Sequence, residues 1–283
     1  AAIAGWLAER GVDVIAADPE VAAEDRGYAD ALAAGGFRAI PEIQPSRHRM
    51  ALPLPADGDA AVVLAGVVKA TRQRIRRAER DGVVVALHDA RVVGIPAVPG
   101  VVAPAEPASA ALDRFYGLLR ATGDRRGFGF AGRDEFLTWW VRAQAAGHLV
   151  YLEAREREAT GDVLGGLVLY RHGRRLSTAH SADRAETRHA HPGTMHLLRW
   201  RAIELALAEG RHEMDLGGVD VAGARRPPLP GEPTWGLYEH KRAFGATWIA
   251  LAGAQERVIR PWRYAAGRAL ARVGRMVRPG GTR

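Results

Sequence analysis

The sequence contains no cysteine, and only two of its 40 basic residues are lysines, Lys69 and Lys241. Without cysteine, a disulfide scaffold and thiolate chemistry are excluded. No apolar run reaches the ~18 residues of a membrane-spanning helix, and no secretory signal peptide is recognisable. These absences fit a cytoplasmic protein of ordinary globular composition, with 47% hydrophobic and 25% charged residues.

The positive charge is concentrated at one end of the chain. The net charge is +8, and residues 256–283 hold eight arginines and one glutamate, so seven of the excess charges lie there. This asymmetry favours a polyanion or an anionic membrane face as a partner, and a solvated tail is the alternative. The same segment predicts a helix whose apolar stripe packs on the first domain and whose rim binds RNA or anionic lipid. The stripe is Trp262, Ala266, Leu270, Val273 and Val277, and the rim is Arg263, Arg268, Arg272 and Arg275.

The first part of the chain reads as alternating helices and strands. Helices are predicted over 1–11 and Glu24–Ala34, and strands over Val12–Ala16, Phe37–Ile40 and His48–Leu54. One long helix is predicted over Asp57–Asp81, with a core-facing stripe of Leu64, Val68, Thr71, Ile75 and Ala78. Because the chain begins inside a helix and without methionine, we expect part of the first domain to be missing.

From Val83 onward the pattern predicts the order strand, helix, helix, three strands, helix, strand, helix, strand. This is the element order of the acetyltransferase-type (GNAT) fold. The proline-rich segment Gly94–Pro107 is interpreted as a linker between two domains. The predicted elements are Val83–Leu87, Leu112–Ala121, Glu135–Ala146, Leu149–Ala154, Val163–Tyr170, Arg175–Ser181, Thr194–Glu209, His212–Leu216, Pro233–Phe244 and Thr247–Ala252.

The sequence gives little support for an acetyl-CoA site or for a metal site. Arg188–Thr194 lies where an acetyltransferase places its pyrophosphate loop, but it lacks the glycines that open backbone N–H groups to phosphate. This argues against acetyl-CoA, and no cofactor is predicted. His180, His189, His191 and His196 are not accompanied by any zinc-ligand pattern, so no metal is predicted.

The segment Gly236–Trp248 carries the most specific motif. Pro233 can occupy the first turn of its helix, and Gly245 can end that helix in a left-handed conformation. In a chain that otherwise uses arginine, Lys241 is a weak hint that a compact ammonium is required, although two leftover lysines can equally mean nothing. The segment resembles the end of the second domain in the Fem family of peptidoglycan-bridge aminoacyltransferases, with His240 where that family has phenylalanine. Lys69–Val83 and Met214–Gly218 extend the resemblance over most of the chain.

The resemblance implies an α/β fold with mixed sheets, built as two tandem GNAT (acyl-CoA N-acyltransferase-like) domains. These are residues 1–93, truncated at the front and completed by 253–283, and residues 94–252. It also implies transfer of an amino acid from aminoacyl-tRNA to an amine on the stem peptide of a peptidoglycan precursor, UDP-MurNAc-peptide or lipid II. Such an enzyme builds interpeptide bridges in cell wall biogenesis, and we expect a monomer, with possible peripheral contact with the anionic inner membrane face.

The catalytic candidates are Lys241 and Asp215. Lys241 is expected to project from an exposed helix face and stabilise the oxyanion of ester aminolysis. Asp215 is expected to orient the amine or accept its proton, or else to bond the turn backbone. The helix face with Lys69, Arg72 and Arg76 either binds phosphate or is solvated and balanced by acidic neighbours. The predicted substrate-binding residues are Lys69, Arg72, Arg76, His180, Ser181, Tyr238 and His240.

Three other functions fit parts of the sequence. The same fold serves acyl-CoA-dependent N-acyltransferases, against which the Arg188–Thr194 loop counts. A Fem-like scaffold can also aminoacylate a peptide natural product from tRNA. A protein of another class would bind RNA or a membrane through the basic tail without catalysis, and then substitution of Lys241 would leave its binding intact.

Overall fold

The computed structural model describes residues 2–44, 48–91, 98–127, 129–130, 132–219, 221 and 223–277. They form two compact units. Unit 1 comprises Ala1–His48, Asp220–Pro227 and Ile249–Arg283, and unit 2 comprises Arg49–Val219 and Pro228–Trp248. No helix in the described ranges is long and apolar enough to cross a membrane.

Unit 1 is built on a small antiparallel sheet. Its strands are β1 (Val14–Ala17), β11 (Gln255–Val258) and β2 (Arg38–Ala39), and β11 lies between the other two. Pairing of Val14 with Val258 ties the start of the chain to its C-terminal part. The helices of this unit are α1 (Ala2–Glu9), α2 (Arg26–Ala34) and α9 (Pro261–Val277). The sequence did not predict β11.

The C-terminal helix α9 forms as predicted, but its apolar stripe does not pack as predicted. Trp262 and Leu270 are each 73% exposed, so the expectation that they pack on the first domain is wrong in this structure. The side chains of Arg272, Val273, Arg275 and Val277 lie outside the described residues. The helix is attached through Tyr264, whose hydroxyl donates to Glu256 Oε1 at 2.7 Å.

Unit 2 is an eight-stranded mixed sheet in the order β10-β3-β9-β8-β7-β6-β4-β5. From β3 to β5, neighbours pair antiparallel except for the parallel pairs β4–β5 and β8–β9. The strands are β3 (Arg49–Pro53), β4 (Val83–His88), β5 (Val101–Val102), β6 (Leu149–Glu156), β7 (Val163–His172), β8 (Arg175–Asp183), β9 (Glu213–Gly218) and β10 (Thr247–Ile249).

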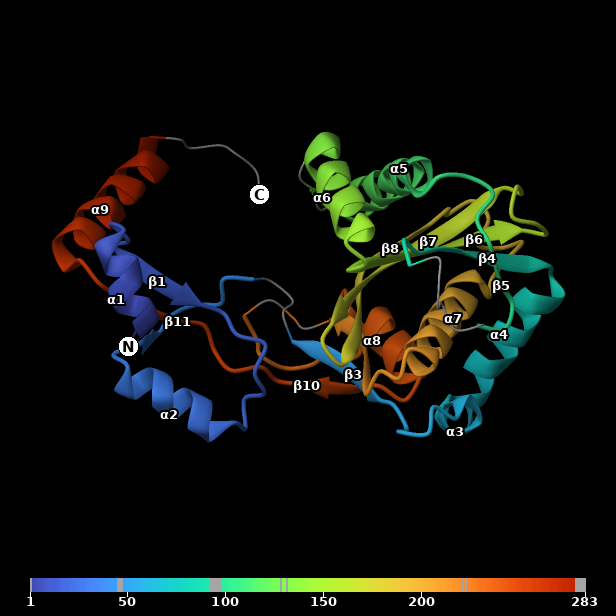
Figure 1. Ribbon diagram of the computed structural model, residues 1–283, viewed down its shortest axis with the longest axis horizontal. Helices are drawn as coiled ribbons and strands as arrows, with labels where there is room; N and C mark the ends of the chain where they lie inside the picture. The colour runs from blue at the N-terminus through green and yellow to red at the C-terminus, as the bar shows by residue number, and fades with distance from the viewer. Residues whose placement is uncertain are drawn as a thin grey trace. The chain divides into compact units, whose positions relative to one another are not determined.

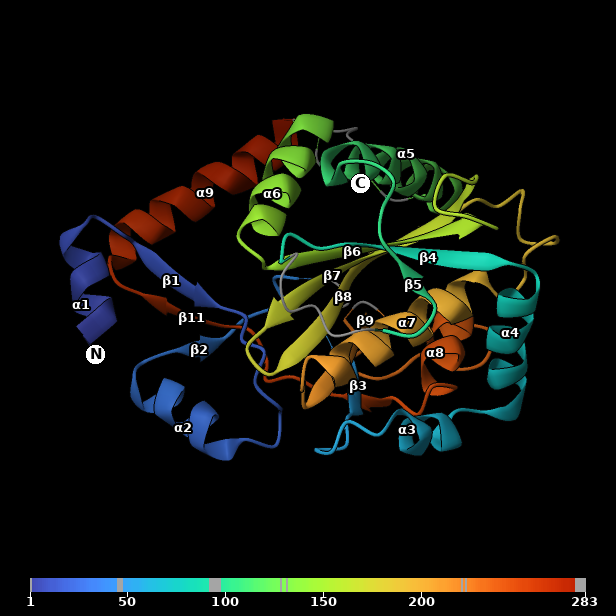
Figure 2. The same cartoon turned by 45° about the vertical axis from the view of Figure 1, so that its right-hand side comes forward.

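Helices cover both faces of this sheet (Figures 1 and 2). On one face, α5 (Ala108–Arg126) and α6 (Arg133–Ala145) enclose a core that includes Phe115 and Trp140. On the other, α7 (Thr194–Ala208) and α8 (Trp235–Arg242) lie over the sheet, with α4 (Lys69–Arg80) beside α7. The α7 helix is buried almost all round, as its apolar sequence predicts. The predicted element order from Val83 is confirmed, with the short β5 added.

Several element boundaries differ from the sequence predictions, and three of the differences concern segments singled out in the sequence. The long helix over Asp57–Asp81 is two helices, α3 (Ala60–Gly66) and α4, because Val67 and Val68 are extended, with ψ of 135° and 138°. Val68 is consequently 53% exposed instead of buried. The α8 helix begins after Pro233, which precedes its N-cap. The predicted strand Thr247–Ala252 ends at Ile249 as β10.

Packing divides the chain at Arg49, whereas the sequence suggested a division at Gly94. The reason is that β3 pairs with β9, and Val63 and Ile75 of α3 and α4 join the core of unit 2. The segment read as a linker, Gly94–Pro107, contributes β5 to the same sheet, while residues 92–97 lie outside the described residues. The division into two tandem GNAT-like domains remains a proposal. Its domains are residues 1–93 together with 253–283, and residues 94–252.

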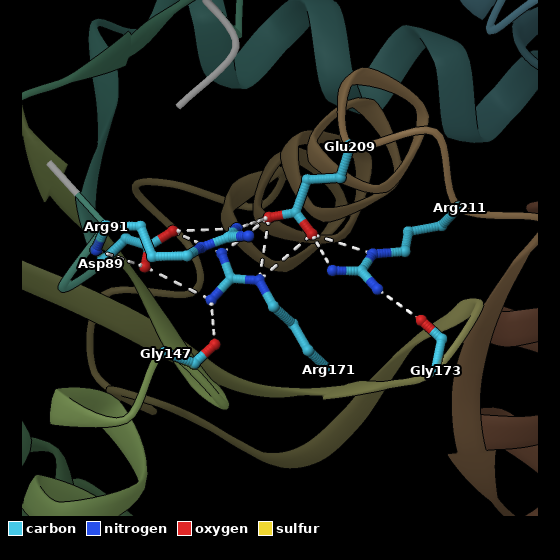
Figure 3. A network of polar contacts seen from close by, with 7 residues as sticks. All are labelled: Asp89, Arg91, Gly147, Arg171, Gly173, Glu209 and Arg211. Carbon is cyan, nitrogen blue, oxygen red and sulfur yellow. Dashed lines mark hydrogen bonds and ion pairs between the residues drawn. The ribbon is translucent and has the colours of Figure 1, made fainter. Parts of the chain in front are cut away.

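A buried ionic network joins the ends of several elements of unit 2 (Figure 3). Arg171, at the end of β7, binds Asp89 after β4 and Glu209 after α7, and it donates to the carbonyl of Gly147 at 2.9 Å. Arg211 donates to Glu209 at 2.6 Å. Burial alone would raise the pKa of Glu209, but the hydrogen bonds from Arg171 and Arg211 hold that pKa below its usual range. The network therefore locks the C-terminal end of α7 to the sheet.

Candidate active site

The two parallel strands β8 and β9 separate at one end. They pair only over Arg175–Ser177 and Glu213–Asp215, whereas β8 continues beside β7 to Asp183. The rest of β8 therefore has one edge without a β9 partner. Backbone groups at such an opening are available to a ligand, and the α7 and α8 helices lie beside it (Figure 2).

A cavity of about 470 Å³ occupies this region of unit 2. Its walls come from the end of β8, the loop 184–193, the start of α7, and residues of α4, α5, β7 and α8. Its lining includes five arginines and one carboxylate, namely Arg74, Arg126, Arg184, Arg188, Arg199 and Asp183. Asp183 is already bound by Arg188, with Nε to Oδ2 at 2.6 Å. A second cavity, lined by α4 and α8, shares Arg74, His196, Gly236 and His240 with the first.

Lys241 is held at the end of β9. Its Nζ donates to the carbonyls of Gly217 at 2.9 Å and Gly218 at 3.0 Å. The residue is only 4% exposed, so the expectation of an exposed lysine is wrong. Gly217 has φ of +80°, and a Cβ there would approach the carbonyl oxygen of Thr178 and Lys241 Nζ. A glycine therefore lets the lysine and the turn come together. Lys241 does not line either described cavity.

Asp215 lies at the same turn. Its Oδ1 accepts a hydrogen bond from Gly217 N at 2.8 Å, which matches the turn-bonding alternative. Its Oδ2 lies 3.8 Å from Arg49 Nη1. Burial raises the pKa of Asp215, while the Gly217 hydrogen bond and Arg49 oppose that rise. The two catalytic candidates thus meet at Gly217, from different sides of one backbone turn.

The predicted substrate-binding residues are brought only partly together. Ser181 and His240 line the cavity. His180 instead lies among aromatic rings, 5.5 Å from Phe136 and 5.7 Å from Trp140, and burial lowers its pKa to about 4. Tyr238 does not line the cavity and contacts the ring of Trp235 at 5.5 Å.

The structure places the basic residues of α4 differently from what the sequence predicted. Arg72 donates to the carbonyls of Leu64 and Ala65, at 3.4 and 3.3 Å, and to Val67, so it closes the end of α3. Lys69 and Arg76 are exposed and line neither described cavity. Arg74, which was not predicted, is the α4 residue that reaches both cavities. Phosphate binding by Lys69, Arg72 and Arg76 stays a prediction.

The loop before α7 is closed by its own turns. The backbone N–H groups of Arg188, His191 and Thr194 donate to carbonyls within the loop, at 3.3, 2.8 and 3.3 Å. Gly193 serves packing, because a Cβ there would collide with the carbonyl oxygen of Arg74 and lie 2.9 Å from Ala78 Cβ. These three N–H groups are therefore engaged within the loop and are not free to bind a phosphate.

The sequence analysis did not identify Arg199 as a site residue, although its side chain lines the cavity. It is 2% exposed, and its Nε donates to His240 Nε2 at 3.1 Å. The sequence did contain a signal for this position. Arg199 lies within a mostly apolar helix, and such a helix is buried together with the polar residues it carries. His196, considered only for metal binding, stacks edge-on to His240 at 4.5 Å. In the described part of the chain, no group of three potential ligands could hold a metal ion.

The strand separation between β8 and β9, with paired helices on each face, defines the class of GNAT-fold acyltransferases. The acetyltransferase (GNAT) domain model matches residues 67–242, and the chain belongs to this family. No curated protein matches the chain.

Solved structures of similar fold extend the comparison. FemX is similar with a TM-score of 0.73 and 15% identity, over 94% of this chain and 77% of its own. A conserved protein of unknown function from Bacteroides thetaiotaomicron has a TM-score of 0.53 and 9% identity, over 89% and 71%. L-PGS from Bacillus licheniformis has a TM-score of 0.50 and 12% identity, over 90% and 70%. The predicted Fem-like fold is confirmed.

Proposed function

We propose that this protein moves an amino acid from aminoacyl-tRNA to an amine on the stem peptide of a peptidoglycan precursor. The likeness of fold to FemX and the Lys241 motif support this activity. The observation that carries it is the arginine-lined cavity beside a loop in which the N–H groups of Arg188, His191 and Thr194 are engaged. A phosphate-bearing donor would there be bound by guanidinium groups, which suits a polynucleotide.

The proposed reaction is aminolysis of an ester. The neutral amine attacks the ester carbonyl carbon, negative charge builds on the carbonyl oxygen, and the ester C–O bond then breaks. The amine proton passes to the leaving ribose oxygen, directly or through a base. Lys241 would stabilise the oxyanion, and Asp215, whose pKa is raised by burial, would serve as the proton acceptor.

The transfer can be tested by mass spectrometry. The protein is incubated with a mixture of charged tRNAs and with UDP-MurNAc-peptide, lipid II or free stem peptides. The expected product is one precursor whose mass has increased by one amino acid residue. If none of the acceptors gains mass while an unrelated peptide does, the tRNA-dependent modification of a peptide natural product is the better description.

An acyl-CoA-dependent N-acyltransferase is the second candidate, because the matched family model is that of acetyltransferases. We nevertheless expect no binding of acetyl-CoA, since the loop N–H groups of Arg188, His191 and Thr194 are engaged in turns. Isothermal titration calorimetry checks this. Saturable binding of acetyl-CoA in the micromolar range would overturn it.

The basic helix α9 is proposed to contact tRNA or anionic lipid. Removal of the chain after Tyr264 deletes Arg268 and the arginines beyond it, so binding should weaken and its salt dependence should flatten. Filter binding of charged tRNA and sedimentation with anionic vesicles, each at several salt concentrations, measure this. Leu270→Gln separates the partners, because its exposed side chain contributes to lipid binding alone. An unchanged salt slope would show that the segment is only solvated.

A further inference from the structure

Among the described residues, Arg199 is the one buried arginine that is not paired with a carboxylate. Arg155 binds Glu153 and Glu106, and Arg201 binds Glu79 and Glu204. Arg199 donates only to the imidazole of His240, and its Nη1 has no hydrogen-bond partner. An ionised group buried in this way is costly unless it is paired. The structure therefore presents a cation without its anion.

The neighbouring groups do not supply that anion. Arg74 Nη1 lies 3.4 Å from His196 Nε2, which adds a second cation beside the first. Burial, with the two arginines adding to it, lowers the pKa of His196 to about 4 and that of His240 to about 2. Both imidazoles are neutral at pH 7, and His240 accepts from Arg199 through Nε2. Burial lowers the pKa of Arg199 to about 10, so Arg199 stays charged.

His240 also fixes the direction of the Arg199 side chain. By accepting from Nε, it fixes a guanidinium that belongs to a cavity-lining side chain and whose buried Nη1 has no hydrogen-bond partner. The start of α7 lines the same cavity through Thr194 and Met195, and the N-terminal end of a helix favours negative charge. The cavity carboxylate, Asp183, is bound by Arg188.

We propose that Arg199 and Arg74 bind one phosphate group of the substrate, and that His240 is the positioning residue that presents Arg199 to it. The phosphate oxygens would accept hydrogen bonds from the guanidinium groups of Arg199 and Arg74. This inference deepens the proposed function, because the phosphate would be that of the acyl donor. The same chemistry occurs at the 3′ end of a tRNA and in coenzyme A.

Titration calorimetry with inorganic pyrophosphate tests the anion site on the whole chain. We expect saturable binding, which Arg199→Met and Arg74→Met each weaken about 10- to 100-fold, the range for loss of one charge-assisted hydrogen bond. Arg77→Met is the matched control, because Arg77 is an exposed α4 residue paired with Asp81 that lines neither described cavity. Wild-type affinity in folded Arg199→Met or Arg74→Met would overturn the proposal.

A pair of variants tests the positioning role of His240. His240→Phe should lower the unfolding temperature, because Arg199 then loses its hydrogen-bond acceptor within the core. Adding Arg199→Met should restore that temperature without restoring pyrophosphate binding. A purely structural histidine predicts unchanged pyrophosphate affinity in His240→Phe, and that result would contradict the positioning role.

Competition distinguishes the sources of the phosphate. A hairpin RNA ending in CCA should displace pyrophosphate from the wild type, and Arg199→Met should bind this RNA more weakly. If coenzyme A displaces pyrophosphate and the RNA does not, the anion site stands and its link to tRNA is overturned. RNA binding that is unaffected by Arg199→Met would show that this anion site does not hold the RNA, and it would leave the proposed transfer reaction standing.

Discussion

Replacing Lys241 by methionine should reduce turnover by about 10²–10³-fold, the range for removal of one oxyanion-stabilising donor. Methionine keeps much of the stem and deletes the charge. The effect on turnover is expected to be large because the ammonium is buried, and a cation in a dry site stabilises developing negative charge more than one in water. Steady-state rates with a verified donor and acceptor measure it.

The structure adds a stability cost to this substitution. Lys241 donates to two backbone carbonyls, so the methionine variant should lose about 1–3 kcal/mol of unfolding free energy. Rates are therefore compared well below the unfolding temperature of the variant. Lys241→Arg serves as the control, and it should rescue turnover only partly, since its charge is bulkier and more diffuse. If the folded methionine variant turns over like the wild type, Lys241 has a structural role only.

Replacing Arg171 by methionine should lower the unfolding free energy by about 3–5 kcal/mol, the usual cost of breaking a buried ion pair. The substitution leaves Asp89 and Glu209 buried, with 0% and 4% of their side chains exposed, and it removes their buried shared partner, so that the partner they still share is Arg91, which is 42% exposed. Urea unfolding followed by circular dichroism measures the change.

Exposed Arg77, paired with Asp81 one helical turn away, is the matched control for Arg171. Arg77→Met should cost no more than about 0.5 kcal/mol, as for other exposed pairs at this spacing. Equal losses for Arg77→Met and Arg171→Met would show that the network contributes little beyond a surface ion pair.

The order of elements from Val83 could be predicted because each element has a clear period and a clear end. The three strands from Leu149 to Asp183 alternate with short turns, and Gly245, with φ of +92°, lies in the turn that follows the end of α8 at Arg242. The Thr194–Ala208 helix shows its burial in its apolar composition. These local signals predicted the GNAT element order, whereas the Fem-like fold was expected from the resemblance of the Gly236–Trp248 segment to the Fem family.

The remaining features depend on contacts that no local pattern contains. Strand β11 exists because β1 and β2, more than 200 residues earlier in the chain, flank it. The break at Val67 follows from tertiary packing and from Arg72, which closes the end of α3. Lys241 is buried where the carbonyls of Gly217 and Gly218 accept its hydrogen bonds. Arg199 lines a cavity that lies where strands β8 and β9 separate.

The proposed activity is tested most directly by offering both donors at once. The protein, one peptidoglycan precursor, acetyl-CoA and a tRNA charged with an isotope-labelled amino acid are mixed, and the precursor is analysed by mass spectrometry. The proposed function predicts a product that carries the labelled amino acid in an amide bond, and loss of that product in Lys241→Met. A product that carries an acetyl group and no labelled amino acid would contradict it.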